Sequence, residues 1–197
     1  MVQHVGLKTR PKDVVTQDQI PYAFPTDTTK SYAFKPGTGW VEAASGGGAP
    51  IKIQVQTQYP GGTNPTAASS TSTWFNRAMN TVLVNTIPGA ALSGSGVSLP
   101  AGTYIVESYA AFSGTNSYKG RIYNTTDSAV ITYSSDGFSP SGNTQIGLSE
   151  ANYQFTLTSA KVITLQCYIS AIGALGRDAN IDGVPNISAE MVFTKIA

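Results

Sequence analysis

Short apolar segments recur along most of this chain, and none of them repeats with the period of a helix. From residue 73 onward such a segment returns about every ten residues and is closed by a cluster of turn-forming residues, which is typical of antiparallel strands. No window of about eleven or more residues shows the period of an amphipathic helix. The sequence predicts strands over 51–56, 73–77, 81–86, 102–112, 119–123, 129–134, 153–157, 161–172 and 187–196. We therefore expect an all-β fold, an antiparallel jelly-roll sandwich.

The two longest predicted strands differ in how their side chains alternate. In 161–172 one face is apolar and the other is polar with one tyrosine. In 102–112 both faces carry apolar groups, with Ile105, Glu107, Tyr109 and Ala111 on one face and Tyr104, Val106, Ser108, Ala110 and Phe112 on the other. Because antiparallel sheets commonly leave one face to water, we expect this strand to have a second cover. The cover is either a loop of the same chain or a symmetry-related subunit.

Residues 1–49 have few alternating apolar positions and cannot form a core of their own. Prolines at 11, 21, 25 and 36 are spaced so that no long helix can form. One compact element is predicted, a short aromatic hairpin around the turn at 35–39. The run Ser45-Gly46-Gly47-Gly48-Ala49-Pro50 indicates a flexible hinge. We place a boundary there, between an extended N-terminal arm over 1–49 and a β-sandwich head over 51–197.

The balance of positive and negative side chains argues against a nucleic-acid partner. Lys and Arg number 12 against 11 Asp and Glu, which leaves a formal charge of +1, whereas nucleic-acid binding needs clustered cations that displace counterions. We expect no nucleic-acid partner.

The longest apolar run is far shorter than the roughly 18 residues of a membrane-spanning helix, so we expect no membrane insertion. The lone Cys167 cannot form an internal disulfide and is predicted to be a small buried side chain.

Residues for catalysis are not evident in the sequence. The single histidine, His4, lies in the arm, the segment least able to orient a side chain for acid–base chemistry. The carboxylates are dispersed, with Glu107, Glu150 and Glu190 in or just before three different predicted strands. A glycosidase needs two of them roughly 5 to 10 Å apart, which the sequence does not reveal. We expect that the protein is not an enzyme.

One motif suggests a cation. Residues 178–183 (DANIDG) match the opening of an oxygen-rich calcium loop, with Asp178, Asn180 and Asp182 as candidate ligands. The closing glutamate should stand at Ala189, but Glu190 comes one place later, and no flanking helices are predicted. The alternative is a polar loop between strands in which Gly183 takes a positive φ. No other metal or cofactor is expected.

Aromatic side chains in turn-rich segments of the head are candidates for sugar contact, because the apolar face of a sugar ring stacks on an aromatic ring. They are Tyr118, Tyr123, Tyr133 and Phe138. Core packing and trimer contact are the alternative roles for each of them. The glycan-binding residues, if any, are therefore not determined by the sequence.

Several stretches of the predicted head together resemble a known family. They are 81–89 (TVLVNTIPG), 97–104 (VSLPAGTY) and 119–127 (KGRIYNTTD), followed by 161–166 (KVITLQ). Over about residues 72–197 the chain resembles the C-terminal jelly-roll heads of tailed-bacteriophage surface proteins, which are similar in fold to the complement and tumour-necrosis-factor trimers. The resemblance implies a homotrimer whose N-terminal arms project from one end.

The arm carries a second resemblance. Residues 20–22 (IPY), 26–28 (TDT), 32–34 (YAF) and 37–40 (GTGW) are similar to the small aromatic hairpin units near the N-termini of phage tail and collar proteins, which tether a fibre to the particle. This similarity implies a virion-docking role for Tyr22, Tyr32, Phe34 and Trp40. The chain lacks a coiled-coil or repeat shaft, which favours a short spike or a capsid decoration over a long fibre.

These observations lead to two expected functions. The first is a non-enzymatic structural protein on the exterior of a tailed-bacteriophage particle, which grips a major capsid, tail or collar protein through its arm and acts as a decoration or cement protein or as a short fibre. The second is a receptor-binding tail adhesin that recognises host surface carbohydrate. In both cases we expect the protein in the virion, after synthesis in the host cytoplasm.

Overall fold

The computed structural model describes residues 32–35, 39–42, 51–65, 67–68, 70–140, 146–178, 181 and 183–196. By its internal contacts the chain divides into two units, Met1–Ala49 and Pro50–Ala197. In the first unit, β1 (Tyr32–Lys35) and β2 (Gly39–Glu42) pair antiparallel, with Phe34 opposite Trp40. The hairpin predicted around residues 35–39 is therefore confirmed. None of the described residues belongs to a helix long and apolar enough to cross a membrane.

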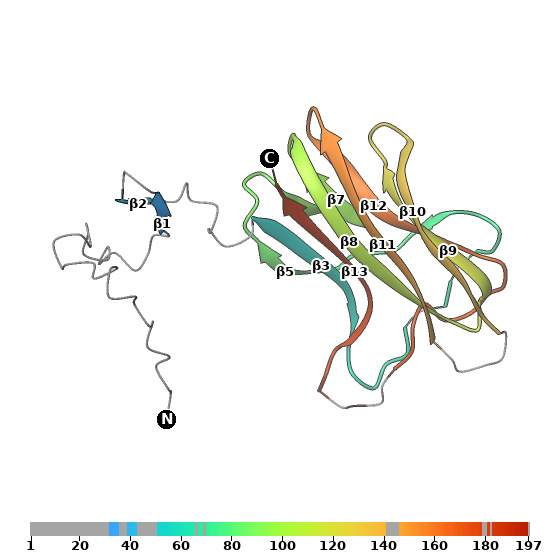
Figure 1. Ribbon diagram of the computed structural model, residues 1–197. Coiled ribbons are helices and arrows are strands. Elements are labelled where there is room, and N and C mark those ends of the chain that lie inside the picture. Colours follow the sequence, from blue (N-terminus) through green and yellow to red (C-terminus); the bar gives the residue numbers. More distant parts are fainter. Residues whose placement is uncertain are drawn as a thin grey trace, which may run out of the picture. The chain divides into compact units, whose positions relative to one another are not determined.

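The second unit consists of two antiparallel sheets packed face to face (Figure 1). The five-stranded sheet has the order β11-β8-β13-β3-β5, formed by Ile146–Leu157, Gly102–Ser113, Asn186–Lys195, Lys52–Tyr59 and Thr81–Asn85. The six-stranded sheet has the order β10-β9-β12-β7-β6, formed by Ala129–Ser139, Asn116–Asn124, Lys161–Ile169, Gly96–Leu99 and Ala91–Ser93. The short strand β4 (Phe75–Asn76) also pairs with β12.

Alternating side chains from both sheets fill the space between them. On the five-stranded sheet, Val106, Met191 and Phe193 are fully buried. On the six-stranded sheet the same holds for Ile122 and for the predicted apolar face of β12, which consists of Ile163, Leu165, Cys167 and Ile169. The apolar core face predicted for 161–172 and the burial predicted for Cys167 are both confirmed, and Thr164 and Gln166 on the polar face are buried as well.

The outer side of β8 bears on the prediction of a second cover. Tyr104, Val106, Ser108, Ala110 and Phe112 are buried, as their shared face requires. On the other side Glu107 is exposed and Ile105 and Tyr109 are partly exposed. No loop within the described residues buries these side chains, so the loop alternative is not supported, and a symmetry-related subunit as the cover stays a prediction.

Two strands were not predicted, and the bounds of several others differ from the prediction, most of all β11, which begins at Ile146 and not at residue 153. The strands β6 and β7 were not expected, because Ala91-Leu-Ser-Gly-Ser-Gly-Val-Ser-Leu99 is rich in small residues that obscure the alternation. They are joined by a tight turn in which Gly94 has a φ of 57°. The strand expected over 73–77 is only two residues long.

Arg77 follows β4 and is buried in the core, with 1% of its surface exposed. Its Nη2 donates to the carbonyl oxygens of Leu175 and Ser188, at 2.8 Å each. Burial lowers the pKa of the guanidinium. These two bonds tie the segment after β12 and the start of β13 to the end of β4, so one charged side chain fixes three segments that are far apart in the sequence.

Candidate functional site

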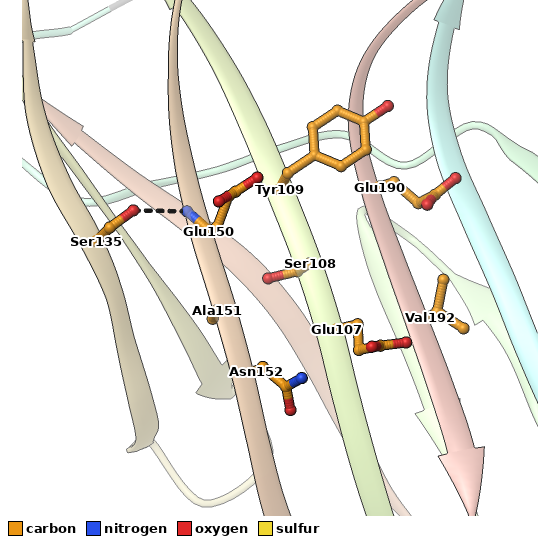
Figure 2. Close-up of a pocket in the computed structure, with 9 residues that line it drawn as sticks. All are labelled: Glu107, Ser108, Tyr109, Ser135, Glu150, Ala151, Asn152, Glu190 and Val192. Atoms are coloured by element: carbon orange, nitrogen blue, oxygen red, sulfur yellow. Dashed lines mark hydrogen bonds between the residues drawn. The ribbon is translucent and has the colours of Figure 1, made fainter.

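A hollow of about 570 Å³ lies on the outer face of the five-stranded sheet (Figure 2). Its lining comes from four strands and is predominantly polar. The residues are Glu107, Ser108 and Tyr109 of β8, Glu150, Ala151 and Asn152 of β11, Glu190 and Val192 of β13, and Ser135 of β10. We call this depression the acidic hollow, after its three glutamates.

The strand register brings the three glutamates to the same face. Tyr109 lies opposite Glu150 of β11 and Glu190 of β13. Two residues earlier along β8, Glu107 lies opposite Asn152 and Val192. Since directly opposed residues on neighbouring strands point to the same side of a sheet, these six side chains form two adjacent rows across the outer face.

Strand β3 holds Glu190 in place. Gln54 Nε2 donates a hydrogen bond to Glu190 Oε2 at 2.9 Å, and Gln56 Nε2 donates to the same oxygen. Gln58 Nε2 donates in turn to Gln56 Oε1 at 2.8 Å. Burial, and then the negative charge of Glu190, raise the pKa of Tyr109 above its usual value.

The acidic hollow presents carboxylate and amide side chains from adjacent strands. Carboxylates and amides from adjacent strands offer acceptor oxygens to a partner that carries hydrogen-bond donors. Within the described part of the chain, no group of three or more His, Cys, Asp and Glu side chains is arranged to hold a metal ion. Glu107, Glu150 and Glu190 are dispersed in the sequence, and their convergence was not predicted, because strand pairing, which the sequence pattern does not specify, brings them together.

A second cavity of about 290 Å³ lies between β10 and β11, where the edges of the two sheets separate. Its lining includes the ion pair of Lys161 and Asp127, whose Nζ and Oδ1 are 2.5 Å apart. The hydrogen bond from Lys161 holds the pKa of Asp127 below its usual value. Tyr153 lines the same cavity and is 46% exposed.

The predicted calcium loop is described only in part. Asn186 Nδ2 donates to Asp178 Oδ1 at 2.6 Å, so this carboxylate is engaged by an amide of β13. Gly183 has a φ of 76°, as the loop interpretation predicts. Asn180 and Asp182 lie outside the described residues. A calcium site formed by Asp178, Asn180 and Asp182 stays a prediction.

The predicted docking residues lie in the first unit. Tyr32 and Phe34 belong to β1 and Trp40 belongs to β2, while Tyr22 lies outside the described residues. Phe34 pairs with Trp40 in this hairpin, and Tyr32 lies two residues before Phe34 on β1, so three of the four predicted residues belong to the hairpin. Their role in docking stays a prediction.

The four aromatic candidates for sugar contact separate into two groups. Tyr118 is a core residue, because it is buried and its ring stacks on Phe112 with centroids 4.5 Å apart. Tyr123 and Tyr133 lie on the outer face of the six-stranded sheet, and Phe138 of β10 is 63% exposed. Sequence reasoning missed the residues that surround Tyr123 and Tyr133 on this face, which are Trp74, Lys119, Arg121 and Tyr168.

No family model matches this sequence, and no curated protein matches it either. Murine APRIL is similar in structure, with a TM-score of 0.50 and 11% identity over 74% of this chain and 98% of that chain. The globular domain of zebrafish complement 1qA has a TM-score of 0.49 and 10% identity over 76% and 98% of the two chains. The PRD1 vertex protein P5 has a TM-score of 0.45 and 16% identity over 76% and 100%.

The similarity to APRIL concerns the fold alone. Together with the two antiparallel sheets, it shows that the chain contains an all-β antiparallel jelly roll. The fold class predicted from the sequence is confirmed.

Proposed function

We propose that this protein is a non-enzymatic structural component on the exterior of a tailed-bacteriophage particle. Its jelly roll forms a homotrimeric head, and residues 1–49 anchor the head to a capsid, tail or collar protein. The bacteriophage assignment is supported by the resemblance of the stretches at 81–89, 97–104 and 119–127 to phage surface heads. We assign no catalytic residue, since the one histidine, His4, precedes the jelly roll in the sequence.

The observation that carries the proposal is the uncovered outer face of the five-stranded sheet. Its exposed apolar side chains include Leu148, at 47%, and Ile187, at 44%. Tyr109, which lines the acidic hollow, and Ile105, which precedes Glu107 on the same face of β8, are partly exposed. No described segment of the chain lies over this face. In the proposed homotrimer the face packs against neighbouring subunits, which removes these apolar groups from water and supplies donors to the acidic hollow.

Sedimentation of the full chain tests this proposal. We expect a trimer at micromolar concentration, and we expect Leu148→Glu to shift the protein toward monomer because it places a charge in a buried contact. Ile172→Glu is the matched control, since Ile172 is 62% exposed and lies beyond the end of β12. This control should remain trimeric. A wild-type monomer, or equal behaviour of the two variants, would contradict the assembly model.

A receptor-binding adhesin is the second candidate function. The observation that favours it is the set of exposed aromatic and cationic side chains on the outer face of the six-stranded sheet. Purified protein that adsorbs to host cells and blocks infection would support this function. Particles that lack the protein, still infect, and rupture at a lower temperature would support a decoration role instead.

A further inference from the structure

Four aromatic rings gather on the outer face of the six-stranded sheet. The centroid of the Trp74 ring lies 5.7 Å from that of Tyr168 and 6.1 Å from that of Tyr133. Tyr123 joins them through Arg121, which contacts both Tyr123 and Trp74. Tyr133 is 54% exposed and the other three rings are partly exposed. We call these four residues the aromatic patch.

Two cations lie among these rings. The guanidinium carbon of Arg121 is 4.1 Å from the centroid of Trp74 and 4.5 Å from that of Tyr123. The Nζ of Lys119 is 5.5 Å from the centroid of Tyr133. Both side chains stand on β9 at alternate positions, so strand periodicity places them on the same face.

The orientation of Arg121 is fixed by a short chain of hydrogen bonds. Its Nε donates to Gln166 Oε1 at 2.8 Å, and Gln166 Nε2 donates to Asn76 Oδ1 at 2.9 Å. Gln166 lies opposite Arg121 in the register of β9 and β12 and is 9% exposed. The guanidinium is therefore held between two rings before any ligand arrives, which lowers the entropic cost of binding.

The charge of this face is not neutralised within the described residues. Lys119 and Arg121 make no ion pair there, although Asp136 lies opposite Lys119 in the register of β9 and β10. Stacked rings suit an apolar face of a ligand, and a guanidinium suits a carboxylate, to which its fork can donate two parallel hydrogen bonds. A ligand that fits this face combines an apolar surface with a negative charge.

We propose that the aromatic patch, with Lys119 and Arg121, binds an acidic saccharide, a sugar ring that carries a carboxylate. The C–H face of the sugar stacks on Tyr133 and Trp74, and its carboxylate lies against the two cations. Two cations do not form the continuous basic track that a nucleic-acid strand requires. This inference deepens the adhesin function, because it names the ligand class of that surface, and it does not depend on the trimer.

Ligand-observed NMR on the full chain tests the proposal. The probes are the methyl glycosides of glucuronic acid and galacturonic acid, and their neutral partners are methyl glucoside and methyl galactoside, in which a hydroxymethyl group replaces the carboxylate. We expect saturation transfer to the acidic sugars and a dissociation constant on the order of millimolar, since the face is open and a single sugar ring is small. The neutral sugars should bind at least about tenfold more weakly.

Two variants locate the site. Tyr133→Ala, which removes the most exposed ring, and Arg121→Gln, which removes the stacked charge, should each weaken acidic-sugar binding by about tenfold or more. Tyr153→Ala is the matched control, because Tyr153 is similarly exposed but lines the cavity between β10 and β11. It should leave binding unchanged. Thermal unfolding of each variant checks that the head is folded. If Arg121→Gln does not fold, Tyr133→Ala still tests the site, because Tyr133 is exposed.

Three results would overturn the inference: no binding of either acidic sugar, equal binding of acidic and neutral sugars, or binding unaffected by both patch variants. Tighter binding of a single-stranded oligonucleotide or an acidic peptide to the same residues would also overturn it. Sedimentation and sugar binding are separate measurements. A monomer that binds acidic sugar would therefore reject the proposed trimer and support this binding site. A trimer that binds no acidic sugar would support the proposed trimer and reject this binding site.

Discussion

The chemistry of Cys167 is set by its position between the two sheets. The side chain is fully buried, and the loss of hydration raises the pKa of its thiol from 9.0 to about 12. The thiolate is the form that attacks an alkylating reagent. At neutral pH the folded protein therefore presents neither an accessible nor an ionised thiol.

We expect the native protein to react with iodoacetamide at pH 8 about a thousandfold or more slowly than the unfolded chain, because the raised pKa lowers the thiolate fraction by that factor. Labelling of the native protein should stay slow between pH 7 and pH 9, since both values lie below the raised pKa. Mass spectrometry over time, with and without denaturant, measures both rates. Rapid labelling of the native protein at pH 8 is the result that this burial does not allow.

Cys167 and Arg77 show that the sequence predicts the burial of some single residues and not of others. Cys167 alternates with polar residues in a long apolar strand, so its burial follows from the strand period. Arg77 is also buried, but its burial is not predicted by any sequence pattern, because charged residues are rarely buried. Its acceptors, the carbonyls of Leu175 and Ser188, are more than 90 positions away in the sequence.

The contact of β9 with β10 and β11 depends on two glycines. Gly137 of β10 lies opposite Tyr118 of β9, and Gly147 of β11 approaches the tip of the same ring. A Cβ atom at either glycine would meet the phenol of Tyr118 closer than real contacts allow. The ring also stacks on Phe112, with planes 13° apart, so it has little room to move. Small residues are required on both neighbouring strands.

Gly147→Ala should therefore lower the free energy of unfolding by about 1–3 kcal/mol, the usual cost of overpacking a core. Chemical denaturation measures this change. The same substitution in a Tyr118→Leu background should cost much less, because leucine lacks the ring tip that the new methyl meets. If Gly147→Ala costs the same in both backgrounds, the steric explanation fails.

Strand elements were more predictable than their pairing. The period of two identifies the core-facing side chains of β8 and β12 correctly, because burial of one face forces alternation on the sequence. The acidic hollow and the aromatic patch were not predicted, because each is assembled across strands. Glu107, Glu150 and Glu190 become neighbours only through the register of β11, β8 and β13.

The division of the chain near residue 49 leads to a prediction for the whole molecule. Deletion of residues 1–48 should abolish incorporation into particles, because it removes the proposed anchor, and should leave a soluble trimer, because the jelly roll has its own core. Immunoblots of purified particles and sedimentation of the shortened protein measure the two effects. Incorporation of the shortened protein at the wild-type level would show that the anchor lies elsewhere.

The two sheets of the head turn their outer faces in opposite directions (Figure 1). If the five-stranded sheets meet at the threefold axis, the six-stranded sheets form the circumference, and three aromatic patches look outward. A cell surface dense in acidic polysaccharide then engages several patches at once, and linked engagement of this kind strengthens attachment by about 10²–10⁴ without any new contact. Because each single contact is weak and reversible, such a particle would stay bound while it moves across the host surface, before it attaches stably.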